Sequence, residues 1–226
     1  SPTVYTLEVT PTATGTMTVN VAADVAIDAA SNGNTIAVQS SQVVDITAPT
    51  APTITMADTA LKAGETTVVT ITFSEAVTNF EIEDLRIENG SLTNLSTSNN
   101  GITWTATFTP TSNIENASNV ISLANTYTDV AGNAGTVATS ANYTVDTLLP
   151  TVTITDDEAG TTANIVNGIV VYTFTFSEAV TTFTIDDIEV TYGTKGTFVE
   201  LSPTVYTLEV TPTATGTMTV NVAADV

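Results

Sequence analysis

Short runs of alternating apolar and polar residues make up most of the chain. Threonine, valine and isoleucine alternate in segments such as TVVTITF, GITWTATFTP and VVYTFTF. This period of two is typical of strands with one buried face. Turn-forming stretches such as ENG, SNNG and AGNAG separate the runs at intervals of roughly 8 to 12 residues. No segment has a sustained helical period, so the pattern predicts an all-β protein.

Two internal repeats divide the chain into modules. Residues 1–25 recur without change at 202–226. Within this long repeat lies a divergent one, in which TITFSEAVTNFEIEDLRI at 70–87 is similar to TFTFSEAVTTFTIDDIEV at 173–190. The divergent repeat indicates a module of about 100 residues, the usual size of an immunoglobulin-like sandwich. We therefore predict tandem immunoglobulin-like Greek-key β-sandwich modules.

Two proline-containing linkers mark the module boundaries, VVDITAPT at 43–50 and TVDTLLPT at 144–151. They predict the last part of one module at 1–47, a complete module at 48–147, and a module at 148–226 that lacks its last strand. Trp104 lies in a strand run and is interpreted as a core residue. In the complete module we expect strands at 52–58, 66–73, 80–88, from Gly90 onward, 101–109, 118–127 and 136–146.

The charge of the chain limits its partners. There are 24 acidic residues, three basic ones and a net charge of −21. Nucleic acid binding needs a basic surface, and an anionic membrane repels an acidic one, so we expect neither partner. The absence of cysteine excludes disulfides and thiolate metal sites, and the absence of histidine and cysteine excludes histidine-based acid–base catalysis and cysteine nucleophiles. We predict no enzyme activity, and cations as the natural partners of this surface.

Oxygen-bearing side chains recur where each module begins. In an antiparallel sandwich, the loops after 66–73 and 118–127 lie at the end where the linker enters. For the complete module, the residues expected at this junction are Asp45, Glu75, Asp84, Asp129 and Asn133. The next junction would use Asp146, Glu178 and Asp187. Asp28 and Asn32 occupy the corresponding loop of the first module, and the counterpart of this pair in the third module would follow residue 226.

This set of ligands suits Ca²⁺, which takes about six to eight oxygen ligands, including backbone carbonyls and water. Mg²⁺ fits less well, because it demands a rigid octahedral geometry. We predict calcium at the junctions, where it would stiffen short linkers. The alternative is that acidic loop tips and strand edges keep a repetitive β protein soluble and prevent edge pairing. Both interpretations also apply to a second acidic group, Asp58, Glu65, Asp156, Asp157 and Glu158.

The ordered motifs FSEAVTNFEIEDLRIENGSL, DVAGNAG and VDTLLPTVTI resemble the bacterial Ig-like repeats of giant surface adhesins. These include Bap-like proteins and the extender regions of repeats-in-toxin adhesins. The resemblance implies an extracellular spacer on the bacterial cell surface, stiffened by calcium and projecting a binding domain. It implies calcium ligation by Asp45, Glu75, Asp129, Asp146 and Glu178. The linkers DITAPTAP and DTLLP depart from the usual Asp-Thr-Thr-Ala-Pro.

Two further hypotheses remain open. One is a ligand-binding module for a sugar or a protein, since Tyr5, Tyr127, Tyr192 and Tyr206 offer aromatic rings, although packing also explains these residues. The other concerns the incomplete modules at the two ends. Residues 33–46 offer the strand that 148–226 lacks, which predicts head-to-tail strand exchange between copies. The alternative is that one end is disordered.

Overall fold

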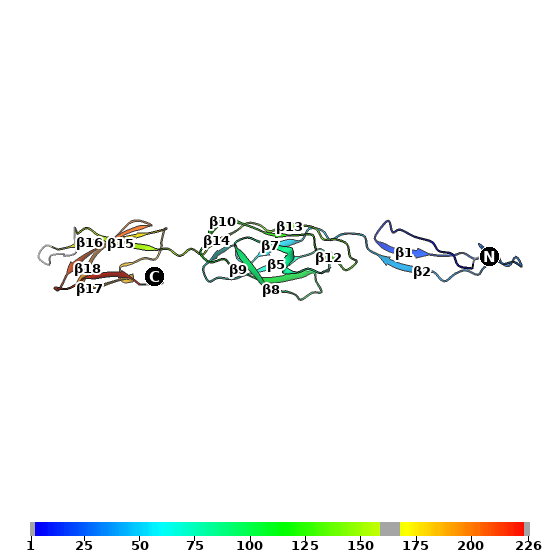
Figure 1. Cartoon of the computed structure of the whole chain (residues 1–226), viewed down its shortest axis with the longest axis horizontal. Coiled ribbons are helices and arrows are strands. Elements are labelled where there is room, and N and C mark those ends of the chain that lie inside the picture. The colour runs from blue at the N-terminus through cyan, green and yellow to red at the C-terminus, as the bar shows by residue number, and fades with distance from the viewer. Residues whose placement is uncertain (1–2, 159–167, 224–226) are drawn as a thin grey trace. The chain divides into compact units, whose positions relative to one another are not determined.

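The computed structural model describes residues 3–158 and 168–223, and its regular structure is almost entirely β-strand (Figure 1). The chain divides into two compact units, residues 1–148 and 149–226. The prediction of an all-β fold is confirmed. Among the described residues, no helix has the length and apolar character needed to span a membrane.

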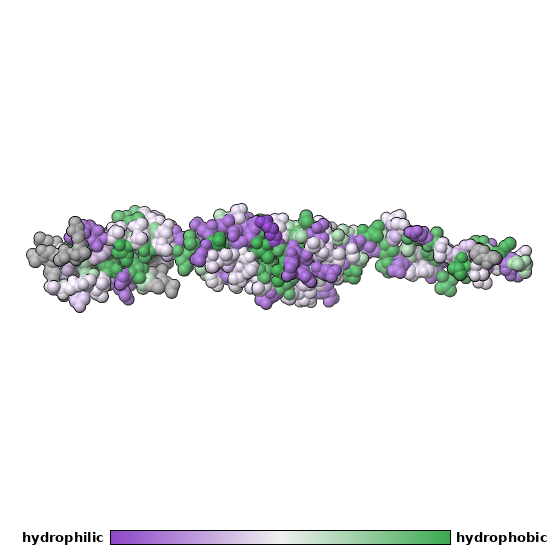
Figure 2. Space-filling model, in the orientation of Figure 1, coloured by the Kyte–Doolittle hydropathy of each residue, from purple (hydrophilic) through white to green (hydrophobic). Residues whose placement is uncertain are grey.

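Residues 3–47, called the N-terminal segment below, contain one antiparallel strand pair. Strand β1 (Gly15–Val19) pairs with β2 (Ser40–Val44), with Gly15 opposite Val44. Residues 3–12 form no strand, and their apolar side chains are exposed. Hydrophobic surface is visible on this part of the chain in Figure 2. Neither hydrophobic core of the described residues includes a residue of this segment.

Residues 48–147, called the middle module, form a β-sandwich. One sheet has four strands, in the order β3 (Thr53–Met56), β5 (Thr67–Thr72), β9 (Thr103–Pro110) and β8 (Gly90–Thr97). A three-stranded sheet has the order β13 (Ala138–Thr139), β11 (Ile121–Leu123) and β7 (Leu85–Ile87). A second three-stranded sheet has the order β10 (Glu115–Asn119), β14 (Tyr143–Asp146) and β4 (Ala60–Lys62). Strands β12 (Thr128–Asp129) and β6 (Val77–Thr78) form a two-stranded sheet. All of these sheets contribute to one hydrophobic core.

Alternation along the strands produces this core. In β5, Val69 and Ile71 are fully buried while the residues between and beside them face outward or are partly covered. Phe108 of β9 packs edge-on against Tyr143 of β14, with ring centroids 5.2 Å apart. Trp104, interpreted from the sequence as a core residue, packs edge-on against Phe80 at 5.2 Å but is only partly buried, at the margin of the core.

The strands of the middle module differ in places from the expected ranges. The range 80–88 begins with a short 3-10 helix, η1 (Ile82–Asp84), and only β7 is strand. The Asp84 carboxylate accepts the backbone N–H of Glu81 at 2.9 Å, which closes the turn and interrupts the strand. After β3, the chain forms the unpredicted strand β4, which runs parallel to β14 with Leu61 opposite Val145.

The second unit repeats part of this sandwich. Its larger sheet has the order β15 (Val152–Asp156), β16 (Val170–Phe176), β19 (Val205–Pro212) and β18 (Gly193–Ser202). After the 3-10 helix η2 (Ile185–Asp187), strand β17 (Ile188–Thr191) pairs with β20 (Thr219–Val222). Phe174, Phe183 and Tyr206 form the centre of the core. Among the described residues, β17 and β20 make a two-stranded sheet where the middle module has three strands.

Candidate metal site

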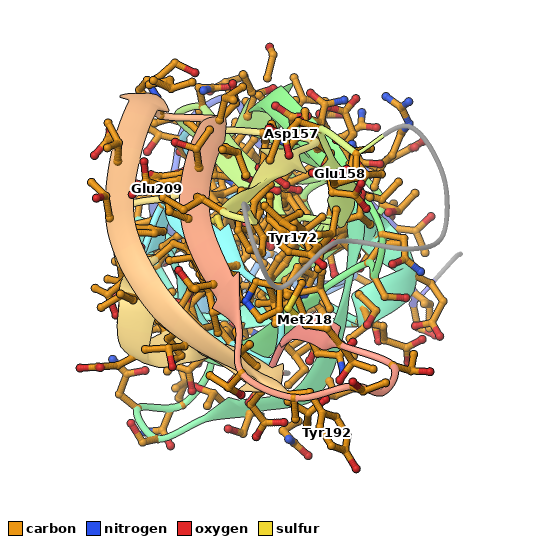
Figure 3. All side chains as sticks on the ribbon, turned by 90° about the vertical axis from the view of Figure 1, so that its left-hand side faces the viewer. Asp157, Glu158, Tyr172, Tyr192, Glu209 and Met218 are labelled. Carbon is orange, nitrogen blue, oxygen red and sulfur yellow. The ribbon has the colours of Figure 1, made fainter. Side chains whose placement is uncertain are left out.

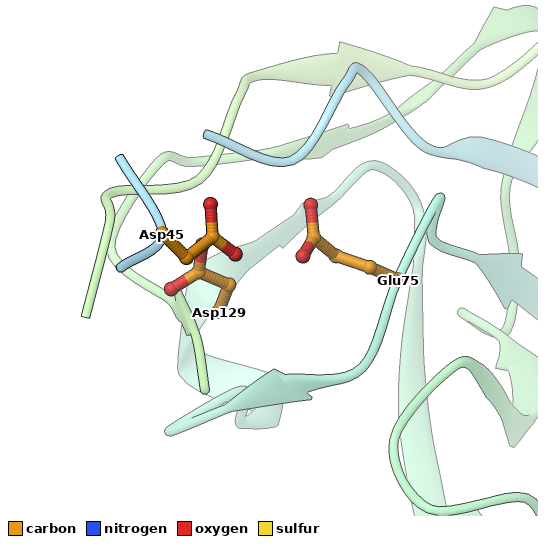
Figure 4. A group of neighbouring side chains, drawn as sticks. All are labelled: Asp45, Glu75 and Asp129. Carbon is orange, nitrogen blue, oxygen red and sulfur yellow. The ribbon is translucent and has the colours of Figure 1, made fainter. Parts of the chain in front are cut away.

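Three carboxylates meet where the linker enters the middle module. Asp45 follows β2, Glu75 lies in the turn between β5 and β6, and Asp129 ends β12. One oxygen of each lies within 4.8 Å of the others. Figure 4 shows the three side chains pointing toward one another. These are three of the five side chains that the sequence predicts for this junction.

The strand pair β6–β12 places two of these carboxylates side by side. Asp129 lies opposite Val77 in this antiparallel pair, so the turn that carries Glu75 passes close to it. The same turn is tied to the linker, because the backbone N–H of Thr50 donates to the Ser74 hydroxyl at 3.1 Å. Local pairing therefore brings together acids that are more than fifty residues apart in the sequence.

The loop that follows Asp129 holds its carboxylate in place. The backbone N–H and the side-chain amide of Asn133 each donate to one carboxylate oxygen, both at 2.8 Å. Gly132 closes the turn with a φ of +94°. The same loop recurs in the N-terminal segment, where Asn32 donates to Asp28 at 2.9 and 3.0 Å. Asp129 is 1% exposed, whereas Asp28 is exposed.

Asn133 also binds the linker. Its side-chain amide nitrogen donates to the backbone carbonyl of Asp45 at 3.2 Å and to that of Thr47 at 3.4 Å. Thr136 adds a hydrogen bond from its hydroxyl to the carbonyl of Pro49 at 2.6 Å. Asn133 was predicted as a metal ligand, and the structure shows it orienting Asp129 and fastening the linker. This positioning role was not predicted.

The electrostatics of the three carboxylates favour a cation. Burial raises the pKa of Glu75, and the negative charges of Asp129 and Asp45 raise it further. Burial alone would raise the pKa of Asp129, but hydrogen bonds from Asn133 and the loop backbone outweigh it and lower the pKa. Lys62 pairs with Glu65 and Arg86 pairs with Glu88, so neither base is paired with the trio. A divalent cation would relieve this accumulation of negative charge.

The sequence matches the bacterial Ig-like domain family over residues 45–145 and again over 146–226. The chain belongs to this family. The prediction of tandem bacterial Ig-like modules is confirmed. No curated protein matches the chain.

One similar solved structure is that of FdeC, described as a broadly conserved Escherichia coli adhesin that elicits protection against urinary tract infections. It shares 14% identity and a TM-score of 0.47, over 94% of this chain and 81% of that one.

Asp84 lies outside the trio in this bacterial Ig-like module. One oxygen of its carboxylate accepts the N–H of Glu81 and closes the η1 turn, and the other accepts the hydroxyl of Thr126, which lies just before β12. Asp187 has the same role in the second module, where it accepts the N–H of Thr184 at 2.7 Å and its hydroxyl at 2.9 Å. The structure does not place Asp84 among the predicted ligands, because both of its carboxylate oxygens accept hydrogen bonds and only Asp45, Glu75 and Asp129 come together.

The other predicted ligands do not form a second trio within the described residues. Asp146 lies in β14, opposite Glu115 and Lys62. Glu178 follows β16 and is half-buried, and Asp28 and Asn32 bond to each other in their own loop. Ligation of calcium by Asp146, Glu178, Asp187 and Asp28 therefore remains a prediction.

Carboxylates of the second acidic group accept hydrogen bonds from backbone N–H groups. Asp58 accepts the N–H of Ala60 at 2.9 Å, Asp156 accepts that of Glu158 at 3.0 Å, and Asp157 accepts that of Val171 at 2.8 Å. Glu65 accepts the N–H of Lys62 and pairs with its ammonium group at 3.5 Å. These contacts favour the interpretation of these acids as turn and surface residues.

Proposed function

We propose that this chain is a calcium-stiffened spacer from a bacterial cell-surface adhesin, which projects a distal binding domain outside the cell. The observation that carries the proposal is the meeting of Asp45, Glu75 and Asp129 within 4.8 Å where the linker enters the middle module. An ion bound there would join the linker to two loops of the module. The family and its tandem arrangement support a repetitive spacer.

The donor set fits calcium. All three side chains offer carboxylate oxygens, which are the hard ligands that Ca²⁺ prefers, and water or backbone carbonyls would complete the shell. The bound ion would supply two positive charges to a site with three negative ones. Asn133 would keep Asp129 oriented for ligation through its two 2.8 Å hydrogen bonds.

Calcium at this position would act mechanically. Small contacts between neighbouring domains resist rocking poorly. An ion that binds only the aligned arrangement stabilises it by mass action, by about 2.7 kcal/mol when free calcium is one hundred times the dissociation constant. Extracellular calcium is at millimolar levels, so even a weak site would be occupied. The proposed location outside the cell therefore matches the proposed ion.

The test is a calcium titration by calorimetry, with small-angle scattering in calcium and in EGTA. We expect binding to the wild type and a larger maximum dimension with calcium. Asp129→Asn should weaken binding at least about tenfold and remove the calcium effect on scattering. An unchanged maximum dimension in the wild type would contradict the stiffening role even if calcium bound.

Asp28→Asn is the matched control. Asp28 has the same hydrogen bonds to its loop as Asp129, but no other carboxylates of the described residues form a trio with it. This variant should retain the wild-type calcium affinity of the site formed by Asp45, Glu75 and Asp129. Equal losses in both variants would indicate that loop stability, and not ligation by Asp129, controls binding.

A ligand-binding module is the weaker proposal. Of the four tyrosines considered for a sugar site, Tyr127 and Tyr206 are 0% and 3% exposed and belong to the cores. Their burial favours packing over sugar recognition.

A further inference from the structure

The turn that carries Glu75 is held from two sides. Val77 follows Glu75 by two residues and is 4% exposed. On one side it lies opposite Asp129 in the pair of β6 with β12. On the other side its backbone N–H donates to the carbonyl of Gly101 at 3.1 Å. Gly101 lies in the hairpin between β8 and β9, so this hairpin helps to fix the turn of the candidate metal site.

Gly101 approaches Val77 more closely than a residue with a Cβ could. Its φ is +87°, in the left-handed region that favours glycine. A Cβ atom at Gly101 would lie 2.6 Å from the carbonyl oxygen of Val77. The hairpin and the turn are therefore in direct backbone contact, and a displacement of Gly101 would also displace Val77.

Trp104 holds Gly101 in this position. Its indole Nε1–H donates to the Gly101 carbonyl at 3.0 Å, so this carbonyl accepts both the indole N–H and the Val77 N–H. A carbonyl oxygen has two lone pairs, and both are used here. The indole ring packs edge-on against Phe80 at 5.2 Å, and this contact orients the donor.

The second unit holds its corresponding turn with a different donor. By strand register, Tyr206 of β19 stands where the middle module has Trp104. Strand β19 pairs with β16, and these two strands carry Glu209 and Tyr172, which are labelled in Figure 3. The Tyr206 ring packs edge-on against Phe183 at 5.1 Å, the same geometry that Trp104 has in the middle module.

The hydrogen bonds of this second turn end on Val180, the counterpart of Val77 in the repeat. The Tyr206 hydroxyl donates to the Val180 carbonyl at 3.2 Å. The Val180 N–H donates to the carbonyl of Pro203 at 2.9 Å, as the Val77 N–H does to that of Gly101. Packing explains the aromatic ring, but in both modules the polar donor on that ring is also connected to the same turn.

We propose that Trp104 is a positioning residue of the candidate metal site. It acts through Gly101 and Val77, which together keep Glu75 facing Asp129. The proposal rests on the calcium site of the proposed function and adds the residue that orients one of its ligands. A carboxylate that is already oriented loses less conformational freedom when it binds an ion, so the affinity is higher. Without the indole N–H, part of this ordering would occur only on binding.

Two variants with the same ring isolate the donor. Trp104→Phe and Trp104→Tyr lose the same part of the indole, but only tyrosine keeps a donor, and Tyr206 shows that a phenol at this position reaches the turn. Calorimetric titration of the full chain with calcium chloride measures the affinity. We expect Trp104→Phe to bind calcium about fivefold more weakly than Trp104→Tyr, the effect of one ordinary hydrogen bond. Tyr206→Phe is the control, because it should leave the affinity of the trio unchanged.

Hydrogen exchange followed by NMR tests the turn without calcium. In EGTA, the Val77 amide should exchange about fivefold faster in Trp104→Phe than in Trp104→Tyr, because its acceptor Gly101 is held less firmly. The amide of Thr144, which donates to Thr59 at 2.8 Å in the same unit, should exchange equally in the two variants. This comparison separates a local loosening of the turn from a general loss of stability.

The two measurements distinguish the possible failures. Equal calcium affinities for Trp104→Phe and Trp104→Tyr, or equal exchange of Val77, overturn the positioning role. Equal acceleration of the Val77 and Thr144 amides also overturns it, because Trp104 would then act on the whole unit. A wild type that binds no calcium contradicts the proposed function, and the exchange of Val77 then decides whether Trp104 holds the turn. If Trp104→Phe does not fold, Tyr206→Phe decides, since the amide of Val180 should then exchange faster than in the wild type.

Discussion

At the scale of single residues, Glu75 shows that negative charge accumulates unfavourably at the candidate metal site. Its pKa is raised by burial and by its two acidic neighbours, so the folded protein binds a proton there more tightly than the unfolded chain does. Without calcium, this group stabilises the fold at low pH and loses that contribution as pH rises through the raised pKa.

We therefore expect Glu75→Gln to increase the melting temperature of the first unit in EGTA at neutral pH, and to reduce the increase that calcium causes. In EGTA, the wild type should gain stability as pH falls from neutral toward the pKa of Glu75, and the variant should gain less. Scanning calorimetry measures both effects. Glu178→Gln, at the matching position of the second unit, should leave the melting temperature of the first unit unchanged.

The buried Tyr143 leads to a prediction about the stability of the first unit at alkaline pH. Burial and the nearby charge of Glu88 raise its pKa to about 12, and its hydroxyl donates to the carbonyl of Glu88. An unfolded tyrosine ionises near pH 10. The first unit should therefore lose stability as pH rises above about 10, because the unfolded chain releases its proton first.

Tyr143→Phe should lower the free energy of unfolding of the first unit by about 1 kcal/mol near neutral pH, because the hydrogen bond is lost. It should also reduce the loss of stability that the first unit shows above about pH 10. Denaturant unfolding at several pH values gives both numbers. The exposed Tyr192 lies in the second unit and provides the control, since Tyr192→Phe should leave both the neutral stability and the alkaline loss of the first unit unchanged. A Tyr143→Phe profile parallel to that of the wild type would contradict the assignment.

At the scale of elements, η1 explains an error in the strand prediction. The run FEIEDL alternates like a strand, but the side chain of Asp84 bonds the N–H of Glu81 and turns the chain. The counterpart TIDD at 184–187 carries a threonine three residues before an aspartate, a pattern close to a capping box. That pattern was available in the sequence and indicates a helical turn.

We expect Asp84→Ala to lower the free energy of unfolding of the first unit by about 1 kcal/mol, as loss of a cap does. Calcium affinity should be unchanged, because Asp84 lies outside the trio. Calorimetric titration and denaturant unfolding of one preparation separate the two effects. A large loss of calcium affinity would restore Asp84 to the ligands.

At the scale of the whole molecule, each unit has its own core. Within the described residues, the core of the first unit contains sixteen buried apolar residues and that of the second contains six. At low protein concentration we expect two unfolding transitions, with the second unit melting first.

Leu208→Ala should lower the melting temperature of the second unit only. It should reduce the free energy of unfolding of that unit by about 2–5 kcal/mol, because Leu208 is fully buried. Leu7→Ala changes the identical residue in the exposed copy and should have almost no effect. A single shared transition would show that the cores unfold together.

Local sequence decided the class of fold and the location of the candidate site, and long-range contacts decided the rest. Alternating residues set the all-β class, and the repeats identified tandem modules and placed Asp45, Glu75 and Asp129 at one junction. Only the tertiary structure separated Asp84 from that trio and showed β4 running parallel to β14, since three residues carry too little pattern to predict a strand. The repeated sequence makes the reason plain: Leu7 and Leu208 share their neighbours along the chain, yet only Leu208 has partner strands that bury it.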